Sequence, residues 1–146
     1  MPYMQATIQE ILRLASSVPF SARTSVGPNT FEGYAIPKNS MVTISLYFMH
    51  RDERVWEEPE KFRPERFLQD SRVVNADKIM PFGHGKRACL GESTARLTLF
   101  IFLASLLQKF TFSKAKSHPA PTLVILRGLS RVPAKFWANV KLRGDD

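Results

Sequence analysis

The chain has 146 residues, enough for one compact domain or for part of a larger one. A hydrophobic share of 44% and a charged share of 23% are typical of globular proteins, so they exclude wholesale disorder and collagen-like or coiled-coil composition. A single cysteine, Cys89, excludes an internal disulfide and a zinc or iron–sulfur site built from several cysteines of this chain. We therefore expect a reducing compartment.

The formal net charge of +8 is unevenly distributed. Residues 1–83 carry 10 basic and 10 acidic side chains, whereas residues 84–146 carry 11 basic and 3 acidic ones. A basic half can bind nucleic acid, an anionic membrane or an acidic protein, although a solvated lysine-rich surface is the simpler interpretation. No nucleic-acid motif accompanies the charge, so we expect no nucleic acid as a partner.

No segment has the length of a membrane span. The most apolar run, residues 97–107, is eleven residues long, whereas a spanning helix needs about 20 apolar residues. The first residues lack the basic start of a secretory signal, and Glu10 and Arg13 interrupt the apolar residues that follow. We expect neither a transmembrane segment nor a targeting signal in this sequence.

The first half of the chain predicts one helix and several short strands. Residues 3–15 place their apolar side chains on one helical face, and Pro19 is expected to end that helix. Turn formers enclose residues 34–36, which are typical of a hairpin strand. Residues 41–49 alternate as in a strand, which is our first interpretation, but a short helix could also bury them. Residues 50–70 are charged and proline-bearing, which favours an ordered meander held by aromatics.

The second half predicts a helix followed by strands. Residues 92–112 form the strongest helical pattern, apolar on nearly every side, so we expect a buried helix. A basic loop, 113–118, should follow it, and residues 122–126 and 136–142 are expected to be strands joined to each other. These short elements cannot cover a helix that is apolar all round, so the chain is expected to be part of a larger core.

The most informative stretch surrounds the cysteine, at residues 82–92. Three glycines, Gly83, Gly85 and Gly91, suit a loop that lies against a planar cofactor, because glycine allows close approach and positive φ. Cys89 opens the predicted helix just after Lys86 and Arg87, and a helix start with nearby cations favours a thiolate.

A thiolate is the metal-binding form of cysteine. One cysteine with only three histidines, His50, His84 and His118, cannot assemble an ordinary zinc site, but a single thiolate suffices as the protein ligand of a haem iron. The alternative is a buried cysteine that acts as a small hydrophobic residue.

Five residues fit the pattern Phe-x-x-Gly-x-Arg-x-Cys-x-Gly: Phe82, Gly85, Arg87, Cys89 and Gly91. This pattern resembles the haem-binding signature of the cytochrome P-450 family.

Two further motifs, in the expected order, strengthen the resemblance. Residues 10–13 resemble the Glu-x-x-Arg helix motif of that family, and residues 64–67, Pro-Glu-Arg-Phe, resemble its meander motif. The sequence at 33–38 and 50–62 is similar to that of the microsomal animal branch of the family, which oxidises drugs, steroids and fatty acids. The resemblance covers essentially the whole chain.

The resemblance implies a role for each residue of the signature. The cofactor would be haem b, with Cys89 as the proximal thiolate ligand of the iron. Phe82 would pack beside the ligand loop and help to set the potential of the iron, although it could equally be an ordinary core aromatic. Arg87 and Arg23 resemble the positions that pair with haem propionates; the alternative for Arg23 is a surface arginine after a turn.

The resemblance also implies a buried structural triad of Glu10, Arg13 and Arg66. Without it, the first two would be an exposed helical pair contributing about 0.2 to 0.5 kcal/mol. Residues 16–21 and the loop around Leu129 and Ser130 resemble substrate-contacting loops but identify no substrate. His84 lies at a variable position of the haem loop and is not expected to be a second ligand.

The implied fold is mainly α with small β-sheets (α+β), with residues 1–146 as the C-terminal part of a single cytochrome P-450 domain. The implied enzyme inserts one atom of O2 into a small apolar substrate, with electrons from NADPH through a reductase whose acidic flavin domain would dock on the basic excess. The full-length parent would lie on the cytoplasmic face of the endoplasmic reticulum membrane.

Groups expected of a complete member are not recognisable in this sequence, among them the membrane anchor and the acid–threonine pair of the oxygen-activating helix. We therefore expect a fragment with no activity alone. Two alternatives remain: a non-catalytic haem-binding or regulatory remnant, and a basic interaction module without haem.

Overall fold

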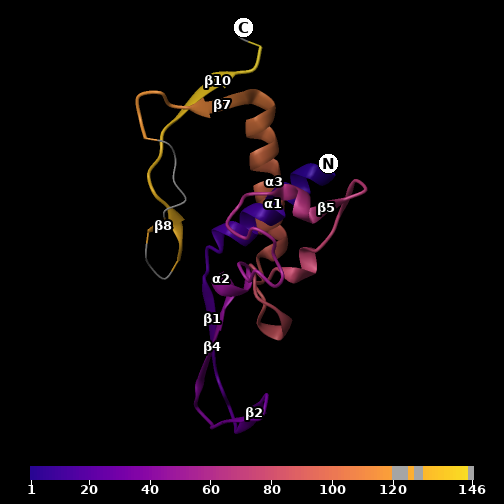
Figure 1. The fold of residues 1–146 in the computed structure, drawn as a ribbon, viewed down its shortest axis with the longest axis vertical. Coiled ribbons are helices and arrows are strands. Elements are labelled where there is room, and N and C mark those ends of the chain that lie inside the picture. The colour runs from indigo at the N-terminus through magenta and orange to yellow at the C-terminus, as the bar shows by residue number, and fades with distance from the viewer. Residues whose placement is uncertain (120–124, 127–129, 145–146) are drawn as a thin grey trace.

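The computed structural model describes residues 1–119, 125–126 and 130–144. Figure 1 shows an elongated molecule, in which α1 (Pro2–Ala15) and α3 (Glu92–Lys109) meet near the middle. Paired strands extend from the middle toward one end, and β7 (Phe110–Lys114) and β10 (Ala138–Leu142) lie at the other (Figure 1). The described residues form three α-helices and five two-stranded antiparallel sheets, which is a mixed α and β architecture.

α1 begins at Pro2, where proline's missing N–H costs nothing, and it ends at Ser16. Ser16 adopts the left-handed conformation, with φ of 39°, and its N–H bonds to the carbonyl of Leu12 at 3.2 Å. This cap ends the helix three residues before Pro19, so the expectation that Pro19 ends it is wrong.

Two hairpins follow α1. β1 (Phe20–Thr24) pairs with β4 (Met41–Ser45), and between them β2 (Asn29–Phe31) pairs with β3 (Tyr34–Ile36). The ambiguous run 41–49 contains both predicted elements in succession, because α2 (Leu46–Met49) begins directly after β4.

The meander packs against α1. Its 3-10 turn η1 (Pro64–Phe67) is followed by β5 (Leu68–Gln69), which pairs with β6 (Arg72–Val73), and by a second 3-10 turn, η2 (Ala76–Lys78). One cluster of buried apolar side chains joins this region to α1: Ala6, Trp56, Phe67 and Ile79. Two aromatics of the meander, Trp56 and Phe67, therefore anchor it, as expected from the sequence.

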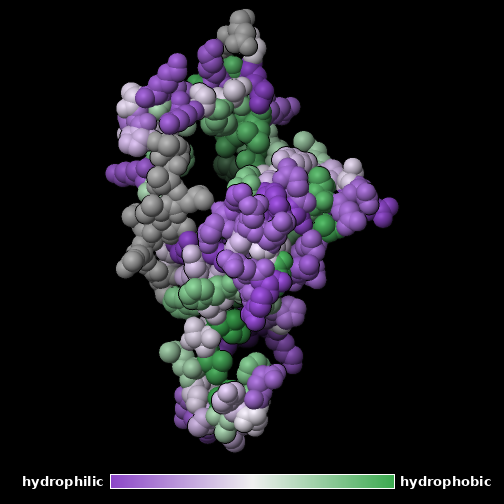
Figure 2. All heavy atoms as spheres, in the orientation of Figure 1, coloured by the Kyte–Doolittle hydropathy of each residue, from purple (hydrophilic) through white to green (hydrophobic). Residues whose placement is uncertain are grey.

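α3 is not buried within this chain, in agreement with the expectation that the chain's short elements cannot cover an apolar helix. Leu97, Ile101 and Phe102 are 59%, 50% and 66% exposed, and none of the residues of α3 is buried. Figure 2 shows this apolar surface in green along α3. Among the described residues, α1 and Phe82 of the cysteine loop contact part of α3, and the side chains named above remain exposed.

The strands after α3 also differ from the prediction. α3 ends at Lys109 instead of residue 112, and β7 (Phe110–Lys114) occupies part of the predicted loop. β7 pairs with β10 (Ala138–Leu142), whereas β8 (Ile125–Leu126) pairs with β9 (Val132–Pro133). Residues 122–124 of the predicted strand lie outside the described residues.

Candidate functional site

The side chains of Glu10 and Arg13 lie on one face of α1 and are fully buried. Nε of Arg13 donates to Oε2 of Glu10 at 2.8 Å, and Nη2 donates to Oε1 at 2.9 Å. Nε of Arg66 lies 3.2 Å from the same Oε1, and the backbone N–H of Arg63 donates to it at 2.9 Å. The structure thus brings together the three residues of the predicted triad, and α1 and the meander are joined by one carboxylate.

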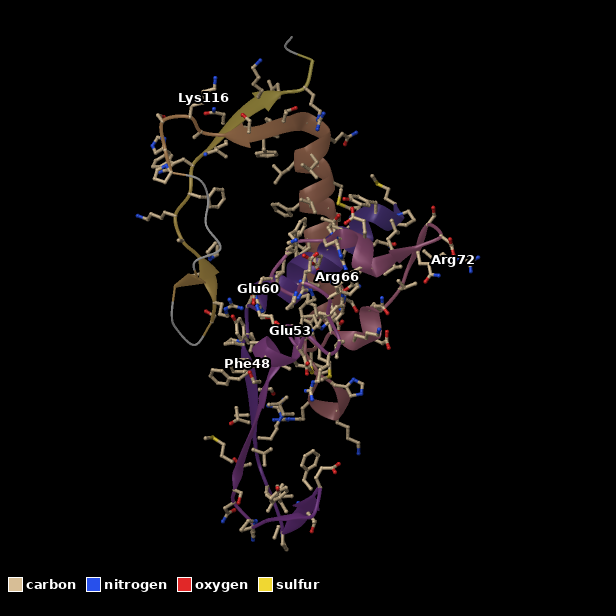
Figure 3. The ribbon with its side chains drawn as sticks, in the orientation of Figure 1. Phe48, Glu53, Glu60, Arg66, Arg72 and Lys116 are labelled. Carbon is tan, nitrogen blue, oxygen red and sulfur yellow. The ribbon has the colours of Figure 1, made fainter. Side chains whose placement is uncertain are left out.

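Trp56 lies beside this cluster. Its ring centroid is 5.4 Å from Cζ of Arg13 and 6.0 Å from Cζ of Arg66, distances at which cations interact with an aromatic face. Figure 3 shows Arg66 beside α1 at the middle of the molecule. The triad and the small apolar core therefore form one unit.

The cysteine loop is built by backbone hydrogen bonds. The N–H of Cys89 donates to the carbonyl of Phe82 at 2.9 Å, and the N–H of Ala88 donates to that of Gly85 at 3.0 Å, which closes the 3-10 turn η3 (Gly85–Arg87). Gly83 and Gly85 have φ of 75° and 71°, a region in which other residues are strained. Two of the three glycines are thus required by the turn itself.

Cys89 is exposed and lines a cavity of about 790 Å³. This volume lies within the range of about 300 to 1,000 Å³ typical of ligand and cofactor sites. Its walls come from the loop after α1, β1, the cysteine loop and α3: among their residues are Val18, Phe20, Pro81, Phe82 and Leu99.

Both predicted propionate partners line the same cavity. Arg23 of β1 donates from Nη2 to the backbone carbonyl of Arg87 at 3.3 Å, which ties β1 to the cysteine loop. Its Nη1 donates to the carbonyl of Ala22 at 2.7 Å. The structure therefore places two guanidinium side chains on the cavity that holds the cysteine.

Phe82 is half-buried on the wall of the cavity. Cζ of Arg96 lies 5.2 Å from its ring centroid, and Arg96 is held by Glu92 at 2.8 Å and by Gln9 of α1 at 3.0 Å. Phe82 is therefore braced by α3, which is in turn tied to α1.

Comparison with known proteins decides the family of this chain. The family described as Cytochrome P450 matches residues 1–137. This chain belongs to the cytochrome P450 family. The predicted resemblance is confirmed.

Cytochrome P450 2U1 of Homo sapiens is 39% identical over 98% of this chain and 27% of its own length. Cytochrome P450 2J3 of Rattus norvegicus is 43% identical over 77% of this chain and 22% of its own length. The chain thus spans about a quarter of the length of these relatives.

A solved zebrafish cytochrome P450, described with abiraterone, superposes with a TM-score of 0.90 at 32% identity. The superposition covers 98% of this chain and 34% of that one. The predicted fold class, part of a P450 fold with small sheets, is confirmed.

The described residues fit the haem of the P450 family. The fit rests on the donor set, because an exposed thiol and two guanidinium groups border one cavity. A β-carbon at Gly85 would meet no atom within 4 Å, so this part of the loop is open, whereas one at Gly91 would lie 3.8 Å from Sγ of Cys89. Gly91 therefore adds room beside the sulfur, and its backbone does not require glycine.

Part of the predicted substrate-contacting segment 16–21 also reaches the cavity. Ser17, Val18, Phe20 and Ser21 line it, whereas Ser16 is buried at the end of α1. Leu129, which belongs to the second predicted loop, lies outside the described residues. Most of the first segment therefore lies on the cavity wall, and its contact with a substrate stays a prediction.

One buried polar residue of this P450 chain was not singled out from the sequence. His50 is completely buried, with Nδ1 3.0 Å from Oγ of Ser16, and its Nε2 accepts the N–H of Met80 at 3.0 Å. Burial, together with the nearby charges of Arg13 and Arg51, lowers the pKa of His50 to about 4. No spacing in the sequence indicates this contact, because its partners are 34 and 30 residues away.

The described part of the chain lacks two features, a membrane-spanning helix and a metal-binding cluster. Among residues 1–119, 125–126 and 130–144, no helix combines the length and apolar character that crossing a membrane requires. The same part of the chain contains no cluster of three or more histidine, cysteine, aspartate or glutamate side chains suited to a metal ion.

Proposed function

We infer that this chain is the haem-binding segment of a haem-thiolate monooxygenase, which inserts one atom of O2 into a small apolar substrate. The observation that carries the proposal is the shared cavity of Cys89, Arg23 and Arg87. A thiol and two guanidinium groups suit an iron porphyrin, which needs one axial ligand and two partners for its carboxylates. The family match supports the reaction class.

Each residue would have a defined part in this function. Cys89 would hold the iron of haem b, Arg23 and Arg87 would bind the propionates, and Phe82 would pack beside the ligand loop and help to set the potential of the iron. When bound, haem b supplies the oxygen-activating redox chemistry. The chain's own residues would bind and orient the group.

The first experiment tests the cysteine. The chain is loaded with haemin, reduced and exposed to carbon monoxide, and the Soret band is compared with that of Cys89→Ala. We expect a red-shifted thiolate-type band in the unsubstituted chain and none in the variant. A folded chain that takes up no haemin would refute the proposal and favour the basic interaction module.

The second experiment distinguishes an enzyme from a non-catalytic haem-binding remnant. The haem-loaded chain is supplied with NADPH, reductase and 18O2, and an apolar substrate is analysed for one incorporated 18O atom. Incorporation that Cys89→Ala abolishes supports a monooxygenase. A thiolate-type spectrum without incorporation favours the remnant.

The electron donor is proposed to be an NADPH-dependent flavoprotein reductase on the cytoplasmic face of the endoplasmic reticulum membrane. The animal cytochrome P450 relatives and the basic excess after residue 83 support this pairing. Lys86 and Lys109 are both exposed and are candidates for contact with an acidic flavin domain.

Charge reversal tests this pairing at low salt, where surface charges act most strongly. Lys86→Glu and Lys109→Glu should weaken binding of the reductase flavin domain, whereas Lys38→Glu in the turn after β3 should not. Equal binding by all variants would contradict the docking proposal.

A further inference from the structure

His50 is held in one tautomer by its neighbours. Oγ of Ser16 donates its proton to the carbonyl of Arg13 at 2.7 Å, so the hydroxyl must accept from Nδ1 of His50. Nε2 accepts the backbone N–H of Met80 at 3.0 Å and therefore carries no proton. The buried ring is neutral, with its proton on Nδ1.

The ring lies between the ion-pair cluster and the cysteine loop. On one side, Nη1 of Arg13 donates to the backbone carbonyl of His50 at 2.7 Å. On the other side, the carbonyl of Met80 accepts the N–H of Gly83 at 3.1 Å, and the carbonyl of Phe82 accepts the N–H of Cys89 at 2.9 Å. A short series of hydrogen bonds thus leads from the cluster to the cysteine.

We propose that His50 is a positioning residue: as a neutral ring it fixes Met80, and through Met80 it fixes the entrance of the cysteine loop relative to α1. The value of a fixed loop for haem binding rests on the proposed function. The positioning itself is a property of this chain and can be measured without haem.

The charges around the ring are consistent with this role. Two positive charges lie near it, Arg13 of α1 and Arg51 of its own segment, and the carboxylate of Glu10 partly neutralises Arg13. The segment before the cysteine loop presents the backbone N–H of Met80 to the ring. A proton on Nε2 would add a positive charge beside two arginines. The protonated Nε2 would also face the backbone N–H of Met80, so that two donors would meet without an acceptor. The neutral ring is therefore the form that can hold the loop.

Two substitutions of His50 distinguish the hydrogen bond at Nε2 from the one at Nδ1. In His50→Gln the amide oxygen can reach the place of Nε2 and accept from Met80, whereas in His50→Asn the amide nitrogen can reach the place of Nδ1 and bond Ser16. The asparagine variant leaves the buried N–H of Met80 without a partner, and an unpaired buried donor shifts a local equilibrium roughly ten-fold or more.

Amide hydrogen exchange of the haem-free chain is the measurement. We expect the N–H groups of Met80, Gly83 and Cys89 to exchange roughly ten-fold faster in His50→Asn than in His50→Gln, with Val140 of the distant β10 unchanged in both. Equal exchange of Met80 in the two variants and the unsubstituted chain would overturn the proposal.

A second measurement does not depend on the folding of any variant. The 15N chemical shifts of His50 in the unsubstituted chain should report a neutral ring with its proton on Nδ1 at pH 7. A ring protonated on Nε2 at that pH would overturn the proposal even if both variants failed to fold. If the chain bound no haemin but showed the expected shifts, the proposed function would fall and the positioning role would stand.

Discussion

Glu10 is the side chain on which the contact between α1 and the meander depends. It carries a buried charge that accepts from Arg13, from Arg66 and from the backbone of Arg63. Removal of one partner from a buried ion pair typically costs about 3 to 5 kcal/mol, because the remaining charge stays buried and uncompensated. We expect Glu10→Gln to lower the free energy of unfolding by this amount, measured by urea denaturation.

The matched control is Glu57→Gln. Glu57 pairs with Arg63 at 2.7 Å, but its side chain is 77% exposed, and such surface pairs contribute about 0.2 to 1 kcal/mol. If the two variants lost the same stability, the buried cluster would not be the link that the structure indicates.

Titration of His50 makes stability depend on pH. The pKa of His50 is about 4 in the folded chain and 6.5 when unperturbed, so the unfolded chain binds more protons between these values. Stability therefore falls as the pH falls through this window, and the loss between pH 7 and pH 5 amounts to about 2 kcal/mol. Denaturation at a series of pH values in this range tests the loss, and it should disappear in His50→Gln, whose side chain does not titrate.

At the scale of elements, the end of α1 combines backbone strain with a side-chain bond. Ser16 has φ of 39°, which costs roughly 1 to 2 kcal/mol for a residue with a β-carbon, and its hydroxyl bonds Arg13 and His50. Ser16→Ala loses the hydroxyl and keeps the strain, whereas Ser16→Gly loses the hydroxyl and relieves it. Glycine should therefore be the less destabilising of the two, by about 1 kcal/mol.

Thermal or urea unfolding of both Ser16 variants provides the comparison. Alanine equal to or better than glycine would mean that the left-handed cap does not control where α1 ends.

α3 exposes apolar side chains that water solvates poorly. Ile101 and Phe102 are at least half exposed on neighbouring positions of the helix. An uncovered apolar surface of this kind promotes self-association and dye binding. We expect Ile101→Lys with Phe102→Lys to reduce binding of the dye ANS and to shift the chain toward lower mass in light scattering, whereas Val26→Lys, at an exposed turn position, should change neither.

How far the sequence predicts these elements depends on the range of the contacts that stabilise them. The apolar periodicity of residues 3–15 predicted α1, the resemblance of residues 10–13 to the family motif implied their burial, and the glycines predicted the tight cysteine loop. The apolar pattern of α3 indicated a surface that needs cover, and α3 is uncovered in this chain, as expected from the shortness of the other elements. The pairing of β7 with β10 was missed, since partners as far apart as Phe112 and Val140 leave no local signal.

At the scale of the whole molecule, two regions of different character meet. The triad, Trp56 and His50 form a buried polar centre, and the cavity of Cys89 lies next to it across the segment from Met80 to Phe82. Figure 2 shows hydrophilic atoms over the meander at the middle and around β7 and β10, and apolar atoms along α3. The buried centre therefore supports the cysteine loop through the segment 80–82, and the thiol of Cys89 is exposed on the cavity.

Haemin affinity should depend on the charged side chains that line the cavity of Cys89 and not on charges elsewhere on the surface. Arg87→Gln should weaken haemin binding roughly ten-fold, because a charge-assisted bond to a carboxylate is lost. Arg72→Gln is the control, since Arg72 points away from the middle of the molecule at the β5–β6 turn (Figure 3). Equal haemin affinities, measured by absorbance titration, would contradict the assignment of Arg87 to a propionate.

The most direct test of the account asks which atom binds the iron. The haem-loaded chain is prepared with natural sulfur and with 34S in its cysteine, and the iron–sulfur stretching region is recorded by resonance Raman spectroscopy. The account predicts a band that shifts to lower frequency with 34S and is lost in Cys89→Ser. A low-frequency band insensitive to the isotope, or typical of iron bound to imidazole, would contradict it.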